Sequence, residues 1–273
     1  MHGIGNDYIY FDCFDEEIAD PAAVSIKLSD RHFSVGGDGV VMILPSPIAD
    51  ATMRMFNADG SEGKMCGNAI RCIGKYLCEI KGIQKDILTV ETLAGVKTLH
   101  IHAKDGKVTS VTVDMGRAIL SPEEIPAAFG GERVVNAPLT VNGETYCVTA
   151  VSMGNPHCVV FGGDPYELDL EKIGPQFESH PAFPERVNTE FVQVLGKNEL
   201  KMRVWERGSG ETWACGTGAC AVAVAAVLNG FADKGADITV HLRGGDLMIR
   251  YTEDTVLMTG PAEIAFDGRV EIN

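Results

Sequence analysis

Short segments in the first half of the chain recur, in the same order, in the second half. Gly5-Asn6 recurs as Gly154-Asn155 and Cys66-Gly67 as Cys215-Gly216, each 149 positions later. Three longer pairs lie at displacements of 150, 150 and 144: HFSVGGDGVV with AFPERVNTEF, TVETLAG with TVHLRGG, and VDMGRA with LMTGPA. Five ordered matches at nearly constant spacing indicate a duplication of the whole fold. The chain should therefore form two halves of the same architecture.

Each half contains one clear helix signal. After Cys66, apolar residues recur at helical spacing, and Gly82 supplies a stop. After Cys215, the segment ACAVAVAAVLNGF is apolar on every side, as expected for a helix buried at a domain centre, and Asn229-Gly230 ends it. Short strand-like stretches surround both: YIYFDCF, VVMIL, MRMFNA, VTSVTVDM, YCVTAVSM, CVVFG, FVQVL, KMRVWER and LMIRYT.

This pattern predicts an α+β fold of two pseudo-symmetric domains, each a β-sheet wrapped around a central helix. The expected domains are residues 1–117 together with 262–273, and residues 118–261. Features at equivalent positions of the two halves should then face each other across a cleft, which is where we expect the active site.

Charge and composition restrict the partners. The chain has 45% apolar and 22% charged residues, typical of a globular protein, and a net charge of −15. Such a charge disfavours nucleic acid and anionic membrane surfaces but not a small anionic substrate. The longest apolar run, 219–228, is about half the ~20 residues of a membrane span. The N-terminus has no basic-then-apolar targeting signal, so we expect a cytoplasmic protein.

Eight cysteines are present, but neither a disulfide framework nor a structural zinc site is expected. A cytoplasmic chain with an ample core has little need of disulfides, and there is no CxxC pair. Six of the cysteines lie within apolar stretches and are interpreted as small, inert core residues: Cys13, Cys72, Cys78, Cys147, Cys158 and Cys220. Cys66 and Cys215 differ because each opens a helix and is followed by glycine.

A helix start favours the reactive form of a thiol. The N-terminus carries partial positive charge and unpaired N–H donors, which lower a thiol pKa and bind carboxylates. Two such ends could clamp one carboxylate through the Gly67-Asn68 and Gly216-Thr217 backbones, with a sulfur on each side of its α-carbon. One thiolate would remove the α-proton while the opposing thiol returns a proton to the other face, inverting the centre. Such a reaction needs neither a metal nor an organic cofactor.

The signature segments resemble those of the diaminopimelate epimerase family. They are MHGIGNDY, FNADGSEGKMCGNAIRC, VSMGNPHCVVF, FPERVN, ERGSGETWACGTGACA and LMTGPAE, in family order along the whole chain. The resemblance implies a cofactor-independent epimerase, without pyridoxal phosphate. It would interconvert LL- and meso-diaminopimelate in the synthesis of lysine and peptidoglycan precursors, as a homodimer.

The resemblance also implies residue roles. Cys66 and Cys215 match the catalytic thiols, and His157 and Glu206 match residues that adjust the thiol pKa values. The matching substrate-binding positions are Gly67, Asn68, Gly216 and Thr217 at the reacting carboxylate, Asn6 and Glu206 near the reacting amine, and Asn57, Asn155, Asn188 and Arg207 at the distal end. Asn amides suit a substrate with both ammonium and carboxylate groups, because each amide donates and accepts. One departure is Gly39, where many family members have Gln.

Two alternatives remain. Proline racemase and hydroxyproline epimerase share the thiol pair but have no use for a distal-end grip, so activity on proline or on diaminopimelate separates them. A non-catalytic thiol-redox or binding protein would instead tolerate Cys→Ser changes without loss of turnover.

Overall fold

The computed structural model describes residues 1–272, and the chain divides into two compact units. The first unit comprises Met1–Asp114 and Thr259–Asn273, and the second comprises Met115–Met258. Within residues 1–272, no helix is long and apolar enough to cross a membrane.

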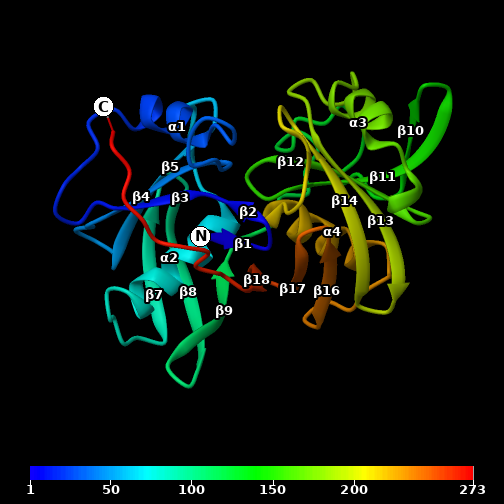
Figure 1. Cartoon of the computed structure of the whole chain (residues 1–273). Coiled ribbons are helices and arrows are strands. Elements are labelled where there is room, and N and C mark those ends of the chain that lie inside the picture. Colours follow the sequence, from blue (N-terminus) through cyan, green and yellow to red (C-terminus); the bar gives the residue numbers. More distant parts are fainter. Residues whose placement is uncertain (273) are drawn as a thin grey trace. The chain divides into compact units, whose positions relative to one another are not determined.

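The first unit is built on one mixed sheet. Its strands follow the order β3-β4-β5-β7-β8-β9, in which β3 pairs with β4 and β5 with β7 in parallel, and the other neighbours are antiparallel (Figure 1). The elements are β1 His2–Gly3, β2 Asn6–Asp7, β3 Ile9–Asp12, α1 Pro21–Ser29, β4 Gly39–Leu44, β5 Ala51–Asn57, β6 Glu62–Gly63, α2 Gly67–Glu79, β7 Ile87–Thr92, β8 Gly95–Lys104 and β9 Lys107–Asp114.

The second unit repeats this plan. Strand β12 pairs with β13 and β14 with β16 in parallel, whereas β13 with β14 and β16 with β17 are antiparallel. An added hairpin, β10-β11, extends the β12 edge. The elements are β10 Ala137–Val141, β11 Glu144–Ser152, β12 Pro156–Gly162, η1 Pro165–Glu167, α3 Leu170–Glu178, β13 Asn188–Gly196, β14 Glu199–Glu206, β15 Gly210–Thr212, α4 Gly216–Leu228, β16 Asp237–Leu242, β17 Gly245–Tyr251 and β18 Val256–Gly260, the last ending in the first unit.

The element order confirms the duplication. The succession β3-α1-β4-β5-α2-β7-β8 in the first unit matches β12-α3-β13-β14-α4-β16-β17 in the second, with the same parallel and antiparallel pairings. In both units one short strand, β6 or β15, precedes the central helix and pairs with the strand before it. The predicted fold class is therefore correct.

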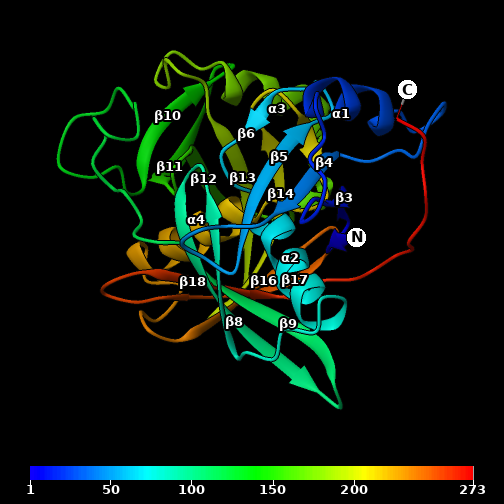
Figure 2. The ribbon, with the colours of Figure 1, turned by 90° about the vertical axis from the view of Figure 1, so that its left-hand side faces the viewer.

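Both predicted central helices are present. Helix α2 begins directly after Cys66 and packs against β8 and β9 (Figure 2). Helix α4 begins directly after Cys215 and packs against β11, β12, β13, β16 and β17, burying almost every side chain, as its uniformly apolar sequence predicts. Ile80, part of the apolar spacing after Cys66, lies just beyond α2 and is exposed.

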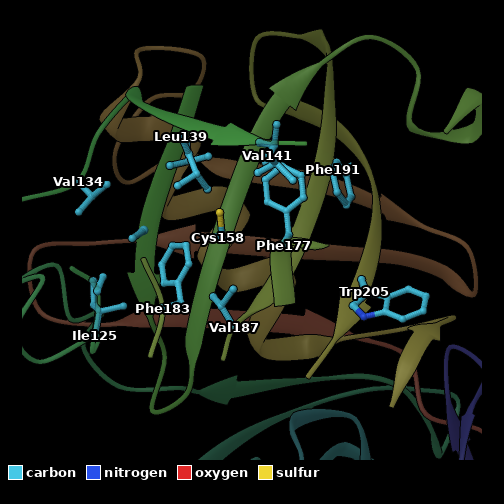
Figure 3. Packing of buried hydrophobic residues seen from close by; sticks show 14 of the residues in the cluster. Ile125, Val134, Leu139, Val141, Cys158, Phe177, Phe183, Val187, Phe191 and Trp205 are labelled. Atoms are coloured by element: carbon cyan, nitrogen blue, oxygen red, sulfur yellow. The ribbon is translucent and has the colours of Figure 1, made fainter. Parts of the chain in front are cut away.

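The other sheet face in each unit is covered by a helix that the sequence analysis did not predict. In the second unit, Phe177 of α3 packs on a core that includes Cys158, Phe191 and Trp205 (Figure 3). In the first, Val24 and Leu28 of α1 pack on Val40, Met42 and Phe56. Helix α1 starts at a local signal, since Asp20 accepts a hydrogen bond from the Ala23 N–H and Pro21 follows it.

Successive side chains of a strand point to opposite faces, so the sheet face that does not pack against α3 is the one that packs against α4. Cys158, Phe191 and Trp205 point toward α3, so their strand neighbours point the other way. Those neighbours are His157 on β12, Asn188 and Glu190 on β13, and Glu206 on β14. Polar residues therefore gather beside the start of α4.

The cysteine interpretation needs one correction. Cys13, Cys72, Cys158 and Cys220 are buried as expected and Cys78 is half-buried, but Cys147 is exposed. Its neighbour Val148 is buried in the core, so Cys147 points to the opposite face of β11, where it is exposed to solvent. None of the eight cysteines forms a disulfide.

Candidate active site

In the first unit, Cys66 is the N-cap of α2. Its backbone is extended, with φ −126° and ψ 120°, and Gly67 is the first helical residue. The fully buried Arg71 ties this first turn in place, donating to the carbonyl of Gly67 at 3.1 Å, to Oδ1 of Asn68 at 3.0 Å and to the carbonyl of Pro261 at 3.1 Å. The helix start thus presents a thiol beside main-chain donors on a rigid support.

A hydrogen-bonded series leads from Cys66 to the surface. Its thiol donates to Oδ1 of Asn6 at 3.4 Å, and Nδ2 of Asn6 donates to Asp38 at 2.7 Å. Arg31 bridges Asp38 and Asp7 at 2.9 and 2.6 Å. Burial, together with the charge of Asp7, raises the pKa of Asp38. Asn6 therefore lies at Cys66, oriented by Asp38.

Gly39 follows Asp38 at a point where the backbone leaves no space. Its φ is +151°, and a Cβ there would lie 2.0 Å from the carbonyl oxygen of Phe56. A side chain at this position would require a different local backbone. The site in this chain is therefore built without one.

In the second unit, Cys215 is the buried N-cap of α4. Its sulfur accepts a hydrogen bond from the N–H of Gly218 at 3.4 Å and lies 3.6 Å from Oγ1 of Thr217. Burial, with the carboxylates of Glu206 and Glu190, raises the pKa of Cys215 well above its usual range. The lowered pKa expected for a thiol at a helix start is therefore wrong for Cys215, which holds its proton and is poised as a donor.

Glu206 lies near this thiol, close enough for its charge to raise the Cys215 pKa. The carboxylate accepts a hydrogen bond from the hydroxyl of Thr212 on β15. Burial raises the pKa of Glu206, and hydrogen bonding partly opposes this rise. A carboxylate of raised pKa beside the thiol is suited to exchange a proton with it.

His157 reaches the same helix start through Asn155. Nε2 of His157 lies 3.1 Å from Oδ1 of Asn155, and Nδ2 of Asn155 donates to Oγ1 of Thr217 at 3.3 Å. The other ring nitrogen, Nδ1, lies 2.7 Å from Oε1 of Glu190. Sequence reasoning missed Glu190, although an acidic residue directly before the apolar run FVQVL was a usable signal.

The residues expected at the distal end of the substrate are engaged within their own units. The buried Asn188 donates to the carbonyl of Pro156 at 2.8 Å and accepts from the N–H of Arg207 at 2.9 Å. The Arg207 guanidinium donates to the carbonyl of Glu185 at 2.8 Å. Asn57 donates to Oγ of Ser61 at 3.0 Å within a turn. Asn188 thus fixes the backbone from which Arg207 projects.

Two helix starts with the same design, one in each unit, define a chemistry. Each presents a cysteine, then glycine, then helix N–H groups that favour a bound anion. Each thiol lies beside a group that can orient it or exchange its proton, Asn6 for Cys66 and Glu206 for Cys215. Within residues 1–272, no three His, Cys, Asp or Glu side chains are grouped so as to hold a metal ion.

The fold is that of two-domain epimerases of known structure. Hydroxyproline epimerase from Agrobacterium vitis matches with a TM-score of 0.66 over 95% of this chain and 86% of that chain, at 16% sequence identity. The PhzF-family phenazine biosynthesis protein from Enterococcus faecalis matches with a TM-score of 0.67 over 96% and 92%, at 14% identity. At these identities the likeness concerns the fold alone.

Sequence similarity is more specific. The family profile for diaminopimelate epimerase matches residues 1–121 and 149–265. The diaminopimelate epimerase of Acetivibrio thermocellus is 54% identical over 275 residues, covering 100% of this chain and 98% of that protein. The chain therefore belongs to the diaminopimelate epimerase family, as its sequence segments predicted.

Proposed function

We propose that the chain is an isomerase that interconverts LL- and meso-diaminopimelate without a cofactor, supplying lysine and peptidoglycan precursors. The observation that carries the proposal is the pair of N-cap cysteines, Cys66 on α2 and Cys215 on α4. Full-length identity above 50% to named diaminopimelate epimerases supports the substrate.

The proposed mechanism uses both helix starts on one carboxylate. N–H groups of Gly67 and Asn68, and of Gly216 and Thr217, bind the carboxylate at the reacting centre and stabilise the charge that builds on it as the α-proton leaves. One cysteine removes that proton as thiolate, and the other donates from the opposite face. Each 1.36 kcal/mol of added stabilisation speeds this step about tenfold.

With its pKa raised by burial and by Glu206 and Glu190, Cys215 starts as the protonated donor. In this direction Cys66 is the base, and it must first lose to solvent the proton that it donates to Asn6. In the reverse direction Cys215 must lose its proton, and the adjacent Glu206 is the group placed to receive it. Asn6 orients the Cys66 thiol, and we assign it and Glu206 to the reacting amine.

The remaining polar residues are assigned to the far end of the substrate. We propose that Arg207 binds the distal carboxylate through its planar guanidinium, on the backbone that Asn188 fixes. Asn57 and Asn155 are assigned to hydrogen bonds with the same distal end of the substrate. This distal recognition favours diaminopimelate over proline, whose ring has no second amino-acid end.

The direct test is α-proton exchange in deuterated water with no cofactor added. The dialysed, chelator-treated enzyme should incorporate deuterium into LL- and meso-diaminopimelate and interconvert them, and it should leave proline unlabelled. Exchange into proline alone would assign the racemase alternative. Absence of exchange from either amino acid would favour a redox or binding role.

We further propose that the protein is a cytoplasmic homodimer that binds small molecules and not nucleic acid. The family resemblance supports the dimer, and the net charge of −15 disfavours a phosphate backbone. Sedimentation equilibrium should give twice the chain mass of 29.3 kDa. A monomer mass across micromolar concentrations would reject the dimer.

A further inference from the structure

A carboxylate with no assigned role lies inside the second unit. Glu190 on β13 is fully buried, on the sheet face that packs against α4. The corresponding strand of the first unit, β4, has the sequence GVVMIL and carries no charge. Because an unpaired buried charge is costly, this position needs a physical reason.

The partner of Glu190 is an equally buried histidine. Oε1 of Glu190 lies 2.7 Å from Nδ1 of His157, and both side chains have 0% exposure. The second oxygen, Oε2, has no hydrogen-bond partner among the described residues. His157 is thus the counter-group of this carboxylate, and the two strands that hold them, β12 and β13, are adjacent and parallel.

Oxygen atoms face both nitrogens of the His157 ring. Nε2 lies 3.1 Å from Oδ1 of Asn155, and Nδ2 of that amide lies 3.3 Å from the hydroxyl of Thr217, which can donate or accept. A carboxylate can only accept, so the Glu190 oxygen facing Nδ1 favours a ring proton on that nitrogen. The titratable groups around the ring are Glu190 on β13 and Glu206 on β14.

We propose that Glu190 is a positioning residue that orients the His157 ring and keeps a proton on its Nδ1. The oriented ring then fixes Asn155, and Asn155 fixes Thr217, which lies 3.6 Å from the Cys215 sulfur. The link to turnover rests on the proposed epimerase function, but the position of the proton on the ring does not.

The first test is nitrogen-15 NMR of the histidine rings in the substrate-free protein. His157 is assigned among the seven histidines by the signals lost in His157→Gln. Its Nδ1 should carry a proton in the parent protein. In Glu190→Gln, whose amide can donate as well as accept, the fraction of rings with a proton on Nδ1 should fall. A parent ring without a proton on Nδ1, or an unchanged ring in Glu190→Gln, overturns the proposal.

The matched control is Glu199→Gln. Glu199 also contacts a histidine, His241, at 3.1 Å, but this pair lies on the surface. The charge change is the same, so only the His241 signals should move. If Glu190→Gln does not fold, the parent spectrum and that of Glu190→Asp, which keeps the charge, still show which ring nitrogen carries the proton.

The second test separates positioning from general structural damage. Glu190→Gln should lower kcat for epimerisation at least tenfold and leave KM within about twofold, because His157 and its partners act on the thiol. Glu190→Asp should recover part of that loss. A rise in KM with unchanged kcat, or equal losses in Asp and Gln variants at unchanged thermal stability, contradicts the role. Lack of epimerisation by the parent would reject the proposed function and leave the NMR result standing.

Discussion

The main-chain N–H of Gly218 donates to the sulfur of Cys215 at 3.4 Å, within the first turn of α4. A Cβ on residue 218 would lie 2.7 Å from Oε1 of Glu190 and 3.2 Å from the Cys215 sulfur. Since both neighbours are buried, Gly218→Ala must displace the thiol or the carboxylate. We expect kcat to fall at least about tenfold, equivalent to 1.36 kcal/mol. Gly163→Ala, with no atom within 4 Å of its Cβ, is the control. Parent-like turnover in Gly218→Ala would show that the thiol position is not critical.

The two thiols should make separable contributions. A serine in place of either cysteine is a far poorer base but can still donate a proton. Cys66→Ser and Cys215→Ser should therefore both lose epimerisation. Each should keep slow α-deuterium uptake from only the isomer whose proton faces its surviving cysteine. The two mutants should prefer opposite isomers when LL- and meso-diaminopimelate are assayed separately. A shared preference, or parent-rate epimerisation in either mutant, would refute the thiol pair.

Removal of the Glu206 charge should ease ionisation of Cys215. After burial, Glu206 is the largest cause of the raised Cys215 pKa, so Glu206→Gln should lower that pKa. Iodoacetamide should then label Cys215 about tenfold faster at neutral pH, because a nearby charge shifts a pKa by one unit or more. Labelling is followed by peptide mass spectrometry in a Cys66→Ser background, where one thiol of the proposed pair titrates. Slower or unchanged labelling would mean that Glu206 does not control this thiol.

An ion pair beside the site should make stability depend on pH. Arg203 donates to both oxygens of Glu211 at 2.8 Å and lowers the pKa of that carboxyl below its usual 4.5. Because the folded pKa is lower, the stabilisation is present above pH 4.5 and is lost as pH falls through the folded value. Glu211→Gln should reduce the free energy of unfolding by about 1 kcal/mol at pH 7.

Urea denaturation of the parent and of Glu211→Gln at a series of pH values tests this. The two unfolding free energies should converge as the pH is lowered below 4.5. A constant difference at every pH would assign the loss to packing instead of charge. Glu211 on β15 pairs with Trp205 on β14, the residue directly before Glu206. The turnover of Glu211→Gln therefore also tests whether this strand pairing holds Glu206 in position.

Local patterns determined much of this protein in advance. The ordered repeats predicted a duplicated fold, and the glycine after each cysteine, followed by an apolar run, predicted the start of α2 and of α4. These predictions succeeded because capping and hydrophobic periodicity act over a few neighbouring residues. Helix α1 escaped prediction for the same reason, since only Val24 and Leu28 among its buried residues are apolar.

Tertiary structure alone decided which polar groups meet. Glu190 and His157 are 33 positions apart, and no local sequence pattern pairs one with the other. They come together because β12 and β13 pair in parallel with His157 opposite Asn188, which places Glu190 on the same face one step further along. The apolar stretch around Cys147 likewise did not reveal that this side of β11 is exposed to solvent. A sequence pattern specifies the direction in which a side chain points on its own strand, whereas strand register and helix packing determine its contacts.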